Sequence, residues 1–152
     1  MMKRVLLWLM FFLSWSVAAS EASIIFGGVS YHFNRQYEYH ETNPSIGIEY
    51  KGFSAIYVAQ NSVEKKSIQL TYTHNFIEES WYSVGVRAGF ASGYKQGDWY
   101  ADGKKYVRSM DLGNGIVPYA ALEVGLVTPI PNLNFMVDVN PQVVIFGFKY
   151  NL

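Results

Sequence analysis

The sequence predicts an all-β protein, an eight-stranded antiparallel transmembrane β-barrel. At the C-terminal end every second residue is large and apolar, and three aromatic side chains, Phe146, Phe148 and Tyr150, share one face. Seven earlier segments show the same two-residue period. After the N-terminal segment, no apolar run approaches the roughly 20 residues that a membrane-spanning helix needs. Such alternation suits a barrel wall, because one face meets lipid and the other meets a polar lumen.

The N-terminal segment indicates export. A short basic stretch that ends at Arg4 precedes an apolar run, 5–13, and small residues follow. This run of roughly nine residues is too short to cross a bilayer and is typical of a secretory signal. We expect residues 1–22 to be a cleaved signal peptide, with cleavage near 19–22, and residues 23–152 to form a single barrel domain. Export combined with a strand-built membrane protein predicts an integral protein of the bacterial outer membrane.

The composition excludes several classes of function. The formal net charge is zero, so the chain lacks the basic surface typical of nucleic-acid binding. It has no cysteine, and therefore neither a disulfide framework nor a thiol nucleophile. We expect a monomer that binds no nucleic acid.

The first two expected strands are 24–33 and 45–50. In the first, Ser30 and His32 alternate with large apolar residues, and in the second Gly47 and Glu49 do so. The next two strands are 53–62 and 67–76, of which the fourth alternates clearly. The face of the third depends on its aromatic residues: if they point to lipid, the inward residues are Ile56, Val58, Gln60 and Ser62.

The last four expected strands are 81–91, 116–126, 133–140 and 144–152. The fifth and seventh alternate clearly, whereas the sixth alternates least and carries Pro118 near its start. The odd-numbered connections are mostly long and the even-numbered ones short, as in outer-membrane barrels with long external loops.

Four charged residues fall on the inward faces of these strands. Two positive and two negative side chains can neutralise one another inside a narrow lumen, where burial is tolerable only for paired charges. They are Glu49, Arg87, Asp138 and Lys149. A soluble lipid-binding barrel would show the opposite pattern, with apolar residues inside.

Several short motifs resemble the outer-membrane lipid A palmitoyltransferase (PagP) family. The similarity runs along the mature chain as scattered matches, among them Tyr31-His32-Phe33, Asn43-Pro44, Ala59-Gln60-Asn61-Ser62, Val84-Gly85-Val86-Arg87-Ala88-Gly89-Phe90, the strand with Pro118 and the aromatic ending. The chain departs from the family in lacking an amphipathic helix before the first strand.

The resemblance implies acyl transfer from a phospholipid donor to a lipid A acceptor, without a metal or soluble cofactor. His32 matches the catalytic histidine of the family and Ser62 its serine, while Asn61 stands in place of its aspartate. An amide cannot carry the charge of a carboxylate. This change leaves open an active variant, a different acyl chemistry or a silent barrel.

The resemblance also implies an acyl-chain pocket inside the barrel. We expect Ile56, Val58, Thr73 and Leu122 to line it, with Thr73 at the floor, where the family has a glycine. A larger residue there predicts an acyl chain shorter than palmitate.

Two other functions remain open. One is a catalytically silent outer-membrane barrel that acts through its external loops, above all the long polar loop 94–114. The other is a lipid A deacylase. It is less favoured, because none of the three histidines is followed two positions later by a serine on the same strand.

Overall fold

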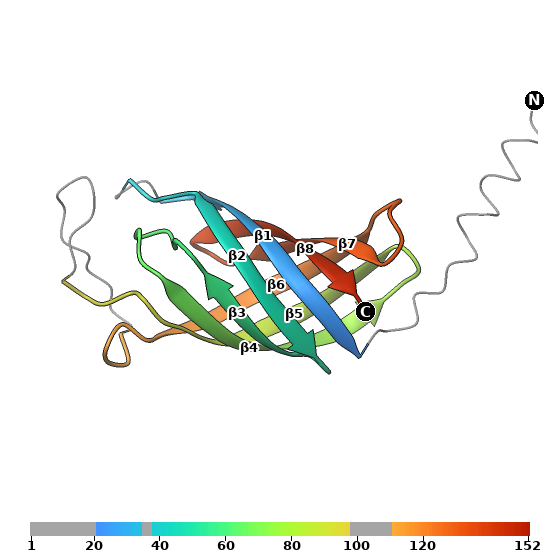
Figure 1. Ribbon diagram of the computed structural model, residues 1–152, viewed down its shortest axis with the longest axis horizontal. Coiled ribbons are helices and arrows are strands. Elements are labelled where there is room, and N and C mark those ends of the chain that lie inside the picture. The colour runs from blue at the N-terminus through green and yellow to red at the C-terminus, as the bar shows by residue number, and fades with distance from the viewer. Residues whose placement is uncertain (1–20, 35–37, 98–110) are drawn as a thin grey trace, which may run out of the picture.

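The computed structural model describes residues 21–34, 38–97 and 111–152 and shows a closed barrel of eight antiparallel strands (Figure 1). The strands are β1 (Ala22–His32), β2 (Thr42–Tyr50), β3 (Phe53–Val58), β4 (Ser67–Glu78), β5 (Tyr82–Ala91), β6 (Val117–Val127), β7 (Leu133–Val139) and β8 (Val143–Asn151). Each strand pairs with its neighbours in the chain, and β1 pairs with β8 to close the barrel. The predicted fold is confirmed. The predicted signal peptide falls almost entirely outside the described residues.

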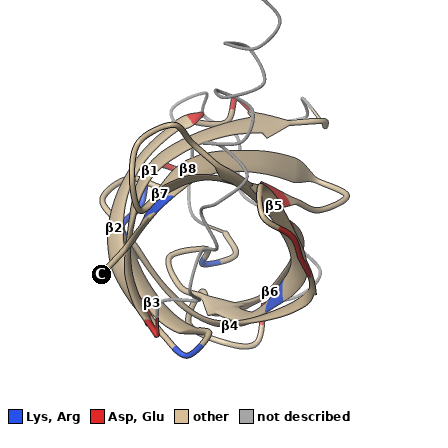
Figure 2. Cartoon of the chain, turned by 90° about the vertical axis from the view of Figure 1, so that its right-hand side faces the viewer, with Lys and Arg blue, Asp and Glu red and all other residues tan. Residues whose placement is uncertain are grey.

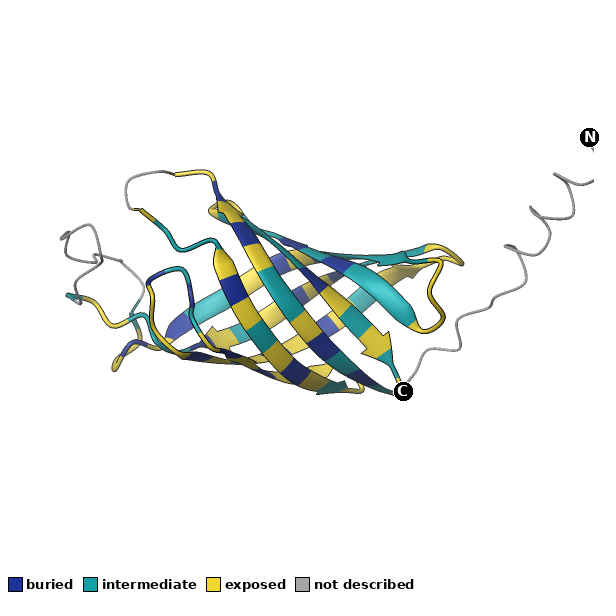
Figure 3. Ribbon diagram, turned by 45° about the horizontal axis from the view of Figure 1, so that its top comes forward, coloured by how far each residue is buried: buried dark blue, intermediate teal, exposed yellow. Residues whose placement is uncertain are grey.

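Buried and exposed residues alternate along the strands (Figure 3). The outward positions carry large apolar side chains that are exposed, among them Ile46, Ile48, Phe53, Tyr57, Ile68, Leu70, Tyr72 and Phe90. Viewed along its axis the barrel is a closed ring (Figure 2). Closure pairs the strand edges, which hydrocarbon requires, and an apolar exterior is what lipid requires. The protein is therefore an integral outer-membrane barrel. Within the described ranges no helix is long and apolar enough to cross a membrane.

A β-bulge interrupts β1 near the end that carries the long loops, which we call the loop end. The pairing of β1 with β2 and with β8 shifts register between Gly27 and Val29. Gly28 lies at φ +111°, and a Cβ atom there would come within 1.8 Å of the Asn43 carbonyl oxygen. Only glycine allows this backbone conformation and this close approach. The bulge thereby sets the path of β1 toward His32.

The wall is incomplete between β6 and β7. Their outermost pair is Leu122 with Val139, so the segment from Val117 to Ala121 has no partner on β7 although it pairs with β5. The β7–β8 connection, 140–142, is short and leaves this edge of β6 uncovered by strand pairing. A notch in the wall results at the loop end.

The structure differs from the prediction in two places along the loop end. β3 ends at Val58 rather than at residue 62, so Asn61 and Ser62 belong to the β3–β4 loop. β2 begins at Thr42 rather than at residue 45. The early end of β3 follows from Asn61, whose side chain binds the backbone of the same loop and turns it away from the sheet.

Candidate functional site

The lumen contains a cavity of about 470 Å³ in its loop-end half. This volume lies within the range of small-molecule pockets, roughly 300–1,000 Å³. Its mouth carries His32, Asn61 and Ser62. Its apolar walls include Ile25, Ile56, Val58, Val117 and Met136, and its polar floor consists of Arg87, Tyr119 and Asp138.

Two of the residues expected in the acyl-chain pocket lie on the apolar wall of this cavity. Ile56 and Val58 are 4% and 5% exposed and line the cavity, whereas Tyr57 between them is exposed on the outer face. The aromatic residues of β3 therefore point to lipid, which settles the face that the sequence left open.

Leu122 does not belong to the pocket. It is exposed on the outer face of β6, next to the buried Glu123. The prediction failed because β6 carries apolar residues on both faces, so that its alternation does not show which face is inward. The inward set of β6 is Val117, Tyr119, Ala121 and Glu123.

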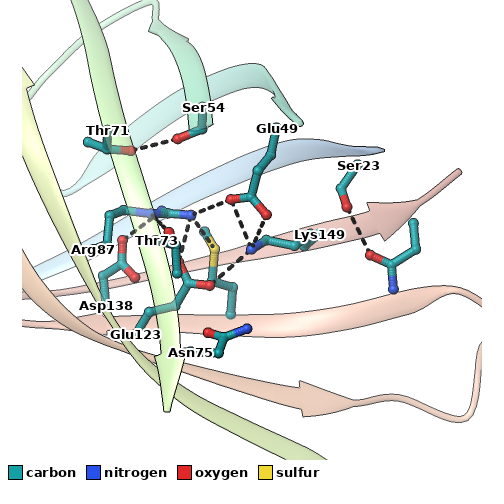
Figure 4. Close-up of polar contacts among 12 residues, drawn as sticks. Ser23, Glu49, Ser54, Thr71, Thr73, Asn75, Arg87, Glu123, Asp138 and Lys149 are labelled. Atoms are coloured by element: carbon teal, nitrogen blue, oxygen red, sulfur yellow. Dashed lines mark hydrogen bonds and ion pairs between the residues drawn. The ribbon is translucent and has the colours of Figure 1, made fainter. Parts of the chain in front are cut away.

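Below the cavity, an ion cluster crosses the lumen (Figure 4). Arg87 is 1% exposed, and its Nη2 lies 2.6 Å from Glu123 Oε2 while its Nη1 lies 2.9 Å from Asp138 Oδ2. Lys149 Nζ lies 2.9 Å from both Glu49 Oε1 and Glu123 Oε1. The four charged residues predicted to face inward all take part. Glu123 was missed, although a lone glutamate within an apolar strand was a signal that could have found it.

Thr73 faces inward as expected but does not line the cavity. Its hydroxyl accepts a hydrogen bond from Arg87 Nε at 3.1 Å and donates one to Glu123 Oε2 at 3.3 Å. Thr73 is thus a member of the ion cluster, and the cavity ends above it at Arg87, Tyr119 and Asp138.

His32 is buried at the end of β1, where it faces the cavity mouth. Its ring stacks on Tyr39 with 4.0 Å between the ring centroids. Glu41 Oε1 accepts a hydrogen bond from the His32 backbone N–H at 3.0 Å and lies 3.7 Å from Nδ1 of the ring. A carboxylate at this position stabilises a positive imidazolium.

Asn61 is occupied by its own loop. Its Oδ1 accepts hydrogen bonds from the backbone N–H groups of Val63 and Lys65, both at 3.0 Å. Its Nδ2 donates to the carbonyl oxygen of Gly93, also at 3.0 Å. Asn61 therefore fixes the β3–β4 loop to the start of the β5–β6 loop.

Ser62 lines the cavity mouth and is half-buried. Its backbone carbonyl accepts a hydrogen bond from His40 N–H at 3.0 Å, which ties the β3–β4 loop to the β1–β2 loop. Tyr39 stacks on His32 and also packs against Val63. The structure thus brings His32, Asn61 and Ser62 to one rim, with Tyr39 joining the two loops.

In the described part of the chain, no group of three His, Asp or Glu side chains is arranged to hold a metal ion.

No protein-family model and no curated protein matches the chain. Among solved structures, a designed transmembrane β-barrel is 17% identical over 88% of this chain and 97% of its own, with a TM-score of 0.56. The outer membrane protein Ail of Yersinia pestis, solved in a phospholipid bilayer nanodisc, is 16% identical over 88% of this chain and 99% of its own, with a TM-score of 0.37. The likeness to the designed barrel shows the transmembrane-barrel fold.

Proposed function

We propose that the protein is an outer-membrane acyltransferase that moves an acyl chain from a phospholipid to lipid A. The observation that carries this proposal is a buried histidine beside a carboxylate at the mouth of a partly apolar cavity of about 470 Å³. A cavity of this size can accommodate one acyl chain. The mouth lies at the end of the long loops, where the head groups of the outer leaflet would lie.

Each residue at the mouth of the cavity has a role in the proposed acyl transfer. His32 acts as the general base that takes the proton of the acceptor hydroxyl while that oxygen bonds to the carbonyl carbon of the donor ester, and Glu41 stabilises the imidazolium that forms. The ester bond to the phospholipid glycerol then breaks, and the imidazolium returns the proton to the lysophospholipid oxygen that leaves. The Ser62 hydroxyl donates a hydrogen bond to the carbonyl oxygen of the donor ester, where negative charge develops. Asn61 positions Ser62 through the backbone of the loop, rather than through the reacting groups.

The notch between β6 and β7 supports entry from the membrane. Pro118 and Ala120 occupy outward positions of β6, between its inward residues, yet both line the cavity. Pro141, on the other side of the notch, also lines it. An uncovered strand edge within hydrocarbon is costly, and Pro118 reduces that cost because it has no backbone N–H. Through this notch an acyl chain can reach the cavity without crossing the polar rim.

A second candidate function is a barrel that binds a lipid without transferring an acyl chain. The observation that favours it is the carboxamide of Asn61, which is bound by three backbone groups and offers no carboxylate to the rim. Such a barrel would act through its loops and its cavity, with His32 serving only to hold Tyr39 and Glu41.

One measurement distinguishes the two candidate functions. The protein is expressed in an outer membrane that has no lipid A acyltransferase of its own, and lipid A is analysed by mass spectrometry. We expect an added acyl group shorter than palmitoyl, because the polar floor stops the chain. His32→Ala should abolish the addition, whereas His74→Ala, which changes an exposed histidine of β4, should leave it intact.

Folding is checked in the same samples by the heat-dependent mobility of the barrel on gels. An unmodified lipid A in the presence of folded wild-type protein contradicts acyl transfer and favours the binding barrel. An added group with the mass of a palmitoyl chain contradicts the predicted chain length.

A further inference from the structure

At the floor of the cavity, only one of the two carboxylate oxygens of Asp138 accepts hydrogen bonds from the described residues. Asp138 Oδ2 accepts hydrogen bonds from Arg87 Nη1 at 2.9 Å and from the Tyr119 hydroxyl at 2.8 Å. Asp138 Oδ1 is buried and accepts no hydrogen bond from any residue in the described ranges. A buried carboxylate oxygen normally has a donor. Because Asp138 lines the cavity, a ligand in the cavity can supply that donor.

The net charge of the ion cluster indicates that the missing hydrogen-bond donor is positively charged. Three carboxylates, Glu49, Glu123 and Asp138, face two cations, Arg87 and Lys149, which leaves one formal negative charge in excess. Lys149 contacts the two glutamates and makes no contact with Asp138 in the described structure. The missing positive charge is therefore on the Asp138 side of the cluster, which is the side that meets the cavity.

The remaining lining of the cavity fits an apolar chain above a polar head. Ile25, Ile56, Val58 and Met136 form one cluster of buried apolar side chains, and all four line the cavity. A ligand with its charged end at Asp138 would place its hydrocarbon part against this cluster, toward the mouth or the notch. A simple fatty acid in the same orientation would place a carboxylate beside Asp138, where the two negative charges repel.

We propose that the cavity floor is a binding site for a primary ammonium group, with Asp138 as its acceptor, and that its ligand is an amphiphile with a single alkyl chain. The site does not require acyl transfer, because it lies below the rim that carries His32. The ligand's ammonium donates to Asp138 Oδ1 and neutralises the excess charge of the cluster.

The test measures binding in the folded barrel by the NMR signal of the Met136 methyl group. The chain has methionines at 1, 2, 10, 110 and 136, of which only Met110 and Met136 follow the expected cleavage site. Barrels labelled with ¹³C-methyl methionine, in phosphatidylcholine nanodiscs, are titrated with dodecylamine, dodecanol or dodecanoate. We expect dodecylamine to shift the Met136 signal at concentrations at least tenfold lower than either of the other two.

Variants separate the site from a general effect of charge. Asp138→Asn should weaken dodecylamine binding at least tenfold. Asp111→Asn, which removes a carboxylate of the β5–β6 loop that does not line the cavity, should not change it. Tyr119→Phe keeps the carboxylate but removes one of its two donors, so it should bind dodecylamine at least as tightly as the wild type. This variant keeps the proposal testable even if Asp138→Asn does not fold.

Three results would overturn the proposal. The first is equal binding of dodecylamine and dodecanol, which would mean that the cavity selects only the alkyl chain. The second is unchanged dodecylamine binding by folded Asp138→Asn, and the third is its loss in folded Tyr119→Phe. None of these results bears on acyl transfer, which is measured separately on lipid A.

Discussion

Arg87 is the residue on which the interior of the barrel depends. It contacts carboxylates from three other strands, Glu49 on β2, Glu123 on β6 and Asp138 on β7. A charge taken from water into a protein interior is tolerable only if it is paired, and removal of one partner leaves the others uncompensated. The same residue supplies the floor of the cavity, so stability and the shape of the site are linked here.

Arg87→Met should destabilise the barrel by about 3–5 kcal/mol, because it leaves the buried carboxylates of Asp138 and Glu123 with fewer partners. The measurement is urea unfolding in lipid vesicles, followed by tryptophan fluorescence. The control is Lys51→Met, which removes an exposed pair with Glu21 at 3.8 Å and should cost at most about 1 kcal/mol. Similar losses in the two variants would show that the cluster is not a major source of stability.

Asn61→Asp introduces a carboxylate at the rim, yet it should not increase the proposed acyl transfer. One carboxylate oxygen would keep the bonds to Val63 and Lys65, while the other would face the Gly93 carbonyl oxygen, to which Nδ2 now donates. We expect a loss of about 1–3 kcal/mol from this repulsion and from the lost hydrogen bond. Urea unfolding and lipid A mass spectrometry on the same variant test the two effects, and a gain in transfer would place Asn61 among the reacting groups.

At the scale of the elements, the bulge in β1 and the early end of β3 shape the rim. The bulge directs His32 toward the cavity, and the end of β3 at Val58 releases the loop that carries Asn61 and Ser62. Neither feature follows from alternation alone. Gly28 and Asn61 signal them locally, since glycine favours backbone irregularities in strands and asparagine favours turns.

Gly28→Ala should disrupt the bulge, because the added Cβ meets the Asn43 carbonyl oxygen and the backbone lies at φ +111°. Gly113→Ala is a matched control: φ is +118°, but the added Cβ meets nothing within 4 Å. The control should cost about 1–3 kcal/mol of backbone strain, and Gly28→Ala should cost more. Equal unfolding free energies for the two variants would contradict the close approach of β1 to β2.

At the scale of the whole molecule, the barrel has an apolar exterior and a lumen divided by the ion cluster. The loop-end half holds the cavity, and the other half holds polar side chains such as Ser23 and Asn151, which bind each other at 2.9 Å. The cavity is lined by residues of the loop end and by Pro118 and Ala120 beside the notch in the wall. The ion cluster lies between the two halves of the lumen.

A charge on the exterior should be costly only within the membrane. Leu70→Arg places a charge on the lipid face of β4, and we expect a loss of about 2–4 kcal/mol. Leu112→Arg changes a similarly exposed leucine beyond the strands, in the β5–β6 loop. It should change the free energy of unfolding by no more than about 0.5 kcal/mol. Urea unfolding in vesicles provides both values, and an equal response would contradict the placement of Leu70 against lipid.

The alternating pattern of the chain was enough to predict the fold, the number of strands and the inward face of most of them. The two-residue period is a local property, so Arg87, Asp138, Lys149 and His32 could be placed from alternation alone. The polar loops between strands also indicated the end of the barrel at which His32 would lie.

Features that depend on pairing between distant strands became visible only in the folded barrel. Glu123 faces inward and Leu122 outward because β6 is held in register with β5 and β7, whereas its own residues are apolar on both faces. The notch exists because β7 is shorter than β6 at the loop end. The unused oxygen of Asp138 depends on where side chains from β5, β6 and β7 meet, and no period within one strand carries that information.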